Sequence, residues 1–155
     1  MPEFSLRARP PTGDPRPAER VRDPDVLASH LHDAAHFPGG HAAELFAPTS
    51  EAEVAAVVRG SAAVLPIGAQ SSLTGGATPM GETLLSTVRL NRIEFIGLDQ
   101  VRVQAGVTIA ALDAALRNAG RAYPPSPTFT SAFVGGTVAT NAAGTATFKY
   151  KTTHD

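Results

Sequence analysis

Cysteine is absent from all 155 residues of the sequence. Disulfide scaffolds, zinc–cysteine sites, iron–sulfur clusters and cysteine nucleophiles are therefore excluded together. No apolar run reaches the roughly 18 residues that a transmembrane helix needs. The N-terminus also lacks the apolar core of a secretory signal peptide, so we expect a cytoplasmic protein without a transmembrane segment.

An excess of charge of either sign is also lacking. The 13 lysines and arginines nearly balance the 14 aspartates and glutamates, for a net charge of -1. This balance argues against a nucleic-acid-binding protein held by a basic surface, and against electrostatic capture by an acidic membrane. Apolar residues make up 43% of the chain, which is enough for a folded core.

Proline and arginine are concentrated in residues 1–22. Because proline has no backbone N–H and the segment has few apolar residues, burial cannot offset the entropy of ordering it. We therefore expect residues 1–22 to form a disordered tail, more simply a solvated tail than a basic docking arm. Residues 23–155 are expected to form the folded part.

Hydrophobic periodicity and capping residues predict an α+β chain. Helices are expected over 25–36, from 51 onward after the N-cap Ser50, over 109–118 after the N-cap Thr108, and over 135–141. Strands are expected over 62–67, 84–87, 93–96 and 101–105.

Residues 66–79, with the sequence PIGAQSSLTGGATP, directly follow a predicted buried strand. The stretch 68–78 contains neither proline nor a charged side chain, so every residue in it offers a backbone N–H. Glycine lets such a backbone approach a ligand closely, and a concave set of N–H groups suits a phosphate or pyrophosphate. An ordinary glycine-rich turn is the alternative.

The spacing in this loop fits neither common phosphate-binding motif. A P-loop needs Gly-x4-Gly-Lys-Ser/Thr, but the fifth residue after Gly68 is Leu73 and no lysine precedes Lys149. A dinucleotide-binding Gly-x-Gly-x-x-Gly turn opens a helix, but Gln70 stands at its second glycine. A phosphate-binding loop at this position is therefore of neither common type.

A second glycine-containing segment follows a proline-rich stretch over 124–127, where proline predicts a rigid extended approach. It continues with a glycine pair and three polar side chains: Gly135, Gly136, Thr137, Thr140 and Asn141. The glycine pair would let the backbone lie against a ligand. The alternative is a helix N-terminus packed tightly on a sheet.

Taken together, these segments resemble the FAD-binding domain of the vanillyl-alcohol oxidase / p-cresol methylhydroxylase (PCMH) superfamily. The similar motifs are APTSEAEV at 47–54, SLTGG at 72–76, VQAGVT at 103–108, ALDAAL at 111–116, and PP-P…GG…ATNA between 124 and 142. Within the superfamily, the branch of the glycolate oxidase FAD subunit and D-lactate dehydrogenase is the most similar. The resemblance covers about residues 24–155.

The resemblance implies an incomplete α+β domain of the PCMH type, in which residues 23–155 are the N-terminal subdomain and the start of the second. Family members continue beyond the element that reads KYKTTHD here, and Lys151 and His154 stand where glycine and arginine are usual. A second chain or domain would supply the rest of the FAD site and the contacts with a small-molecule substrate. The chain alone is expected to bind FAD weakly, to be inactive and to aggregate through open strand edges.

The implied function is the FAD-binding portion of a flavin-dependent oxidoreductase that oxidises a 2-hydroxy acid or related alcohol by hydride transfer. One alternative is a non-catalytic remnant or nucleotide-binding module. Another is a flavoenzyme like the peptidoglycan-precursor reductases, although their Arg/Ser/Glu catalytic set cannot be located here.

The resemblance also assigns cofactor-binding residues, but no catalytic residue. Those expected at the pyrophosphate are Gly68, Ala69, Gln70, Ser71, Ser72, Thr74 and Gly75, and those along the middle of FAD are Gly135, Gly136, Thr137 and Asn141. Relatives with covalent flavin often carry a histidine where Gln70 stands, so non-covalent FAD is implied. The early histidines His30, His32, His36 and His41 are interpreted as solvated surface residues, and no metal site is expected.

Overall fold

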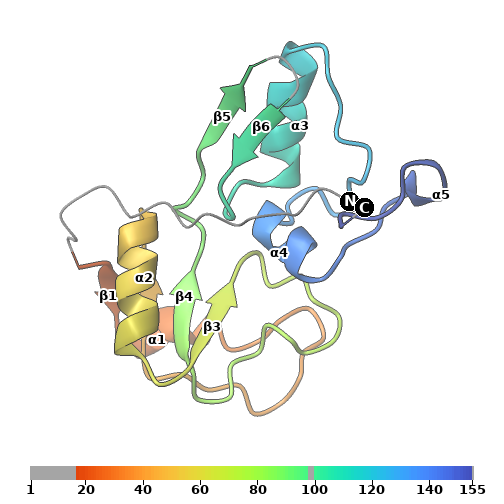
Figure 1. Cartoon of the computed structure of the whole chain (residues 1–155). Coiled ribbons are helices and arrows are strands. Elements are labelled where there is room, and N and C mark those ends of the chain that lie inside the picture. Colours follow the sequence, from red (N-terminus) through yellow and green to blue (C-terminus); the bar gives the residue numbers. More distant parts are fainter. Residues whose placement is uncertain (1–16, 98–99, 155) are drawn as a thin grey trace, which may run out of the picture.

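The structure is a computed structural model that describes residues 17–97 and 100–154. One sheet contains four strands in the order β1 (Glu19–Val21), β2 (Leu45–Ala47), β4 (Thr83–Ser86) and β3 (Val64–Ile67). The other pairs β5 (Ile93–Ile96) with β6 (Gln100–Val103). The helices are α1 (Pro24–Ala28), α2 (Glu51–Gly60), α3 (Ile109–Asn118), α4 (Val134–Ala139) and α5 (Thr147–Tyr150). Figure 1 shows the second sheet and α3 together at the top of the view, with the four-stranded sheet below them.

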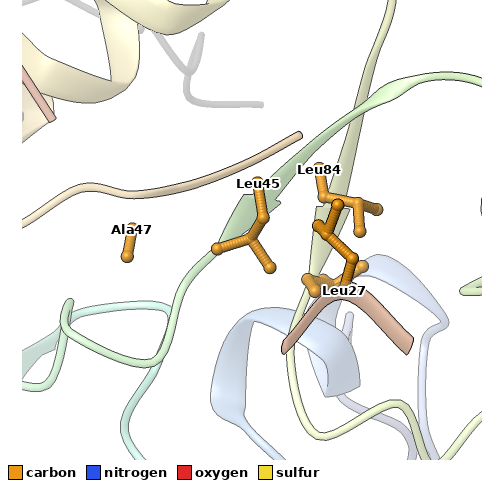
Figure 2. Close-up of a cluster of buried hydrophobic side chains, with 5 residues drawn as sticks. Leu27, Leu45, Ala47 and Leu84 are labelled. Carbon is orange, nitrogen blue, oxygen red and sulfur yellow. The ribbon is translucent and has the colours of Figure 1, made fainter. Parts of the chain in front are cut away.

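The four-stranded sheet lies between α1 and α2. Strands β2 and β3 both run parallel to β4, and β1 runs antiparallel to β2. Successive residues of β4 face opposite sides, so Leu84 packs with Leu27 of α1 (Figure 2) and Leu85 packs with Val57 of α2. Strand β3 is left at the edge of this sheet, and its last residue leads directly into the glycine-rich loop.

The two-stranded sheet is covered by α3. Strands β5 and β6 are antiparallel, and their apolar residues pack with Val107, Leu112 and Leu116. The hydroxyl of Thr108 caps α3 by accepting a hydrogen bond from the N–H of Ala111 at 3.1 Å. Gly120 ends the helix with a φ of 68°. The helix and the strand pair therefore form one small apolar cluster.

Several expectations about secondary structure are confirmed and two are wrong. Helices α2 and α3 begin after the predicted caps, and β3 to β6 lie within a residue or two of their predicted positions. The helix expected over 25–36 ends at Ala28, and residues after it form a loop that is hydrogen-bonded to the glycine-rich segment. The expected disorder over 1–22 is wrong for Glu19–Val21, which form β1; residues 1–16 lie outside the described ranges.

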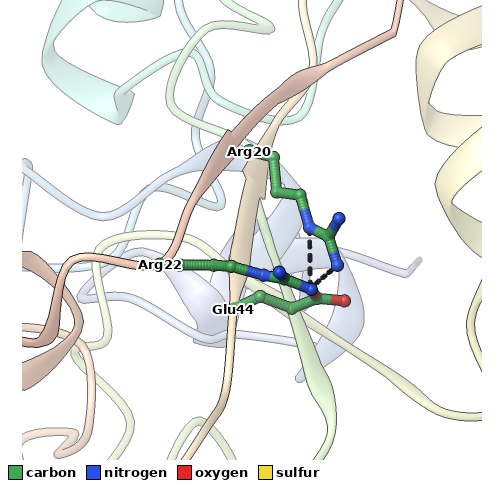
Figure 3. Close-up of polar contacts among 3 residues, drawn as sticks. All are labelled: Arg20, Arg22 and Glu44. Atoms are coloured by element: carbon green, nitrogen blue, oxygen red, sulfur yellow. Dashed lines mark hydrogen bonds and ion pairs between the residues drawn. The ribbon is translucent and has the colours of Figure 1, made fainter.

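Ion pairs and one ring contact add to the backbone pairing that orders β1. Glu44, just before β2, accepts hydrogen bonds from Arg20 Nε at 2.8 Å and from Arg22 Nη2 at 3.3 Å (Figure 3). The Arg20 guanidinium also lies over the ring of Phe46, 5.6 Å from its centroid. The three residues of β1, Glu19–Val21, are thus ordered by contacts with β2 and with Glu44, which are distant in sequence.

We expect Glu44→Gln to make unfolding less dependent on pH. Hydrogen bonds and charge from Arg20, together with Arg22, lower the pKa of Glu44, although partial burial opposes them. Because the folded pKa lies below the unfolded one, this stabilisation is present above the unfolded pKa and is lost as pH falls through the folded value. We expect a difference below about 1 kcal/mol, since both arginines are exposed. Thermal unfolding of Glu44→Gln and of the original chain at neutral and acidic pH measures this difference in stability. An equal difference at both pH values would contradict the prediction.

Candidate functional site

The loop after β3 presents a run of backbone N–H groups that the protein does not use. Within the described ranges, no intramolecular hydrogen bond is donated by the N–H groups of Gly68, Ala69, Gln70, Ser71, Ser72, Leu73, Gly75 and Gly76. Unpaired donors of this kind are normally satisfied by water or by a ligand. The predicted row of donors is therefore present as a structural feature.

The remaining N–H groups of the loop are used to shape it. Thr74 donates to the hydroxyl of Ser72 at 3.2 Å, and Thr78 donates to the carbonyl of Gly75 at 3.1 Å. The hydroxyls of Ser72 and Thr74 are also 3.0 Å apart. Gly75 has a φ of 78°, in the left-handed region that glycine adopts without steric cost.

The loop itself carries no charged side chain, and the nearest acid in sequence is turned to a backbone donor. Glu82 accepts a hydrogen bond from the N–H of Met80 at 2.6 Å, and this bond, with that of its own N–H, lowers the pKa of Glu82. The carboxylate of Asp33 does contact the end of the loop, but it is buried and accepts the N–H of Ala77. Along the rest of the loop a bound anion would meet N–H and hydroxyl dipoles, which phosphates favour.

The two glycine-containing segments meet at the start of α4. A β-carbon at Gly68 would lie 3.2 Å from the ring of Phe133, the residue that precedes α4. Farther along, a β-carbon at Gly144 would lie 1.8 Å from the carbonyl oxygen of Ser126. The structure thus brings the first loop to the second segment, and the proline-rich stretch to the end of that segment.

Most residues assigned to the middle of FAD have structural contacts of their own. Gly135 donates its N–H to the carbonyl of Ala105 at 2.9 Å, and a β-carbon there would lie 2.7 Å from that of Ala105. Thr137 is 3% exposed and donates its hydroxyl to the carbonyl of Val134. Asn141 accepts a hydrogen bond from the N–H of His154 at 3.0 Å. These contacts join the segment to Ala105 after β6, to the first turn of α4 and to His154.

Gly136 is the exception in this group. It is exposed, and a β-carbon built on it meets no other atom within 4 Å. Its N–H donates no hydrogen bond to another described residue. Gly136 is therefore the member of the second segment that remains open to a ligand.

Two hollows lie away from this loop. The larger, of about 500 Å³, is mainly apolar and lies beside α2, β3 and β4, where Val54, Val58 and Leu85 line it. The second hollow, of about 360 Å³, lies beside α3 and is lined by Phe95, Val101 and Leu116. No residue between Gly68 and Gly76 lines either hollow.

The early histidines behave differently from one another. His32, His36 and His41 are exposed, as expected. His30 is half-buried, and its Nδ1 lies 3.3 Å from Oε1 of Gln70, so its interpretation as a solvated surface residue is wrong. Among the described residues, no group of three or more His, Cys, Asp or Glu side chains could hold a metal ion. No helix in these ranges is long and apolar enough to cross a membrane.

The chain is similar to curated 2-hydroxy acid dehydrogenases. The D-lactate dehydrogenase of Anaerostipes hadrus is 40% identical over an alignment of 116 residues. The match covers 69% of this chain and 24% of that protein. The D-2-hydroxyglutarate dehydrogenase of Xanthomonas citri pv. viticola is 39% identical over an alignment of 116 residues. The match covers 70% of this chain and 25% of that protein. The chain thus spans about a quarter of the length of these curated relatives.

Solved structures show the same fold. An alkyldihydroxyacetonephosphate synthase aligns with a TM-score of 0.75 at 19% identity, covering 88% of this chain and 28% of that one. Cholesterol oxidase from B. sterolicum aligns with a TM-score of 0.56 at 22% identity, covering 65% of this chain and 21% of that one. The α+β fold of the PCMH type is thereby confirmed. Residues 42–155 also match the family model described as FAD binding domain, so the chain belongs to the FAD-binding domain family.

Proposed function

We propose that this chain is the FAD-anchoring part of a flavin-dependent oxidoreductase that oxidises a 2-hydroxy acid or a related alcohol. The observation that carries the proposal is the row of unpaired N–H groups between Gly68 and Gly76, in a chain of the FAD-binding domain family. The relatives named D-lactate dehydrogenase and D-2-hydroxyglutarate dehydrogenase support the class of substrate.

The residues of the loop fit a pyrophosphate. They offer N–H and hydroxyl donors and include no acid, so the negative charge of the two phosphates meets dipoles of the correct sign. Gly68, Ala69, Gln70, Ser71 and Ser72 hold the pyrophosphate, and Thr74 and Gly75 continue the same wall. In the second segment, Gly136 offers the free N–H toward the middle of FAD, and Gly135, Thr137 and Asn141 fix that segment in place.

When bound, FAD supplies the chemistry by accepting a hydride from the substrate. This chain contributes position and electrostatics, and none of the proposed residues acts as a general base. A further domain or a second chain supplies the rest of the FAD site and the contacts with the small-molecule substrate. The short coverage of the relatives supports this division.

FAD binding is tested first, by titrating the chain with FAD and following flavin fluorescence and the thermal unfolding midpoint. A ligand that binds only the folded state raises that midpoint. Binding of ADP with no preference for FAD would favour the second candidate, a nucleotide-binding module without catalysis. The substrate class is tested by adding D-lactate or D-2-hydroxyglutarate to the flavin-loaded chain, produced together with the domain or second chain that completes the FAD site. Bleaching of the flavin absorbance supports oxidation of the acid.

We also propose that FAD is held without a covalent bond, because the amide of Gln70 is not a nucleophile and is hydrogen-bonded to protein atoms. Acid precipitation of the flavin-loaded protein is then expected to release all of its flavin into the supernatant. The half-buried His30 beside Gln70 makes this a meaningful test, since an imidazole is a possible attachment point. Flavin fluorescence that stays with the precipitated polypeptide would contradict the proposal.

A further inference from the structure

The side chain of Gln70 joins the two ends of the glycine-rich loop. Its Nε2 donates to the carbonyl of His30 and to the carbonyl of Ala77, both at 2.9 Å. Its backbone carbonyl accepts a hydrogen bond from the N–H of Ala34, also at 2.9 Å. One residue at the start of the loop is therefore bonded to the end of the loop and to the segment that follows α1.

A buried carboxylate completes the same connection. Asp33 is 3% exposed, and its Oδ2 accepts the N–H of Ala77 at 3.2 Å while Oδ1 accepts the N–H of Ala35 at 3.1 Å. The N–H of Asp33 lies 3.3 Å from the hydroxyl of Thr78. The negative charge of Asp33 is thus directed at the backbone just beyond the row of free N–H groups.

The backbone of Gln70 has a conformation that its side-chain hydrogen bonds must stabilise. Its φ is 47°, in the left-handed region that glycine adopts most readily. Because a residue with a β-carbon adopts this conformation at a steric cost, the hydrogen bonds of the Gln70 amide offset that cost. The amide reaches back to His30, and the family match begins only at residue 42. The segment that braces the loop therefore lies outside the matched domain.

We propose that Gln70 and Asp33 are positioning residues that fix the loop, so that its free N–H groups between Ser71 and Gly76 are arranged before a pyrophosphate arrives. The inference rests on the proposed function of the loop. A loop that is already ordered loses less conformational entropy when it binds, which increases affinity without any new contact to the ligand.

The experiment compares Gln70→Gly and Asp33→Asn with the chain itself. Gln70→Gly removes the amide while suiting the left-handed backbone, and the isosteric Asp33→Asn removes one of the two acceptors. Gln104→Ala is the matched control, because it loses a side-chain bond from the N–H of Arg92 just beside the two-stranded sheet, away from the loop. Amide hydrogen exchange reports on the N–H groups of Ala34, Ala35 and Ala77, and calorimetric titration gives the affinity for inorganic pyrophosphate.

In Gln70→Gly, we expect the Ala34 and Ala77 amides to exchange faster and pyrophosphate affinity to fall about tenfold, the effect of losing two hydrogen bonds partly offset by a better backbone. In Asp33→Asn, the amide of Ala35 or of Ala77 exchanges faster. The Gln104→Ala control keeps the original values of both. Unchanged exchange and unchanged affinity in Gln70→Gly overturn the inference, and unchanged exchange in Asp33→Asn overturns it for Asp33.

Failure of the proposed function gives a different result. If pyrophosphate binds neither the chain nor any variant, the loop is not an anion site. The exchange rates still decide whether Gln70 and Asp33 fix the loop. Faster exchange in Gln70→Gly with the pyrophosphate affinity of the original chain would mean that the two residues stabilise the loop but do not position its donors, which also overturns the inference.

Discussion

Gly106→Ala is expected to lower the free energy of unfolding by about 3 kcal/mol or more, the upper range for forcing an extra carbon into a packed interior. A β-carbon at this position would lie 1.8 Å from the carbonyl oxygen of Thr87 and 2.9 Å from that of Leu90. Both are backbone atoms, which cannot rotate away as the end of a side chain can. The backbone around Gly106 must therefore move.

The position of Gly106 makes such a movement costly. It lies between β6 and α3, and its N–H donates to the carbonyl of Leu90 at 2.8 Å, after the end of β4. The segments that follow β4 and β6 are thus joined here by a direct backbone contact. Its neighbours Leu90 and Val107 are 8% and 2% exposed, so a shift would also disturb apolar packing on both sides.

Urea unfolding measures this effect, with Gly60→Ala as the control. Gly60 is the last residue of α2, and a β-carbon there meets no atom within 4 Å. We expect the control to be neutral or more stable by up to about 1 kcal/mol, because alanine favours a helix more than glycine does. Equal urea midpoints for Gly106→Ala and the original chain would show that the close approach is not required.

The elements that were predicted correctly are those specified by neighbours in sequence. Helix α2 begins after Ser50, whose hydroxyl accepts the N–H of Glu53 at 3.2 Å, and α3 begins after Thr108 in the same way. A cap and an apolar stripe over 10 residues contain most of the required information. The alternation of Val101 and Val103 with polar residues likewise indicated β6.

The elements that were missed depend on distant residues. The helical pattern after Pro24 continues past Ala28, but the buried carboxylate of Asp33 binds Ala77, 44 residues away, and the segment takes a loop conformation instead. Strand β1 is polar in sequence and is ordered by β2 and by Glu44. No local pattern reports contacts over such separations, so periodicity alone could not place these residues.

The candidate site was predicted in part for the same reason. The absence of proline and charge in the loop correctly indicated free N–H groups, which is a local property. Whether a residue touches a ligand or packs the fold is not local. Gly135 and Thr137 are engaged by Ala105 and Val134, whereas Gly136 is open. Asp33 was not identified, because a single acid in an apparent helix gives no signal of burial.

Gly75→Val is expected to reduce the affinity for FAD about thirtyfold or more. The sequence suggests that a branched side chain at a loop glycine would block the approach of the pyrophosphate. The structure gives a different cause, because a β-carbon at Gly75 would point at the ring of Phe37, 3.1 Å away. The φ of 78° adds a cost of about 1–2 kcal/mol for a residue with a β-carbon.

The contact with Phe37 and the positive φ would both change the orientation of the free N–H groups. Valine is β-branched and tolerates the left-handed conformation poorly, so the turn at Gly75 must change or the ring of Phe37 must move. Phe37 is 50% exposed and can yield, which leaves the backbone as the larger cost. A changed turn reorients the free N–H groups of Gly75 and Gly76, and about 2 kcal/mol of lost interaction corresponds to the expected thirtyfold change.

Three variants separate these causes when FAD affinity is measured by flavin fluorescence. Gly60→Ala is the control, because Gly60 ends α2 outside the loop and its β-carbon would meet no atom within 4 Å, so we expect unchanged affinity. Gly75→Asn should lose less than Gly75→Val, because asparagine adopts positive φ more easily. Adding Phe37→Ala to Gly75→Val should restore only a small part of the lost FAD affinity, because the backbone cost remains. A Gly75→Val protein that binds FAD as tightly as the original chain would remove this turn from the site.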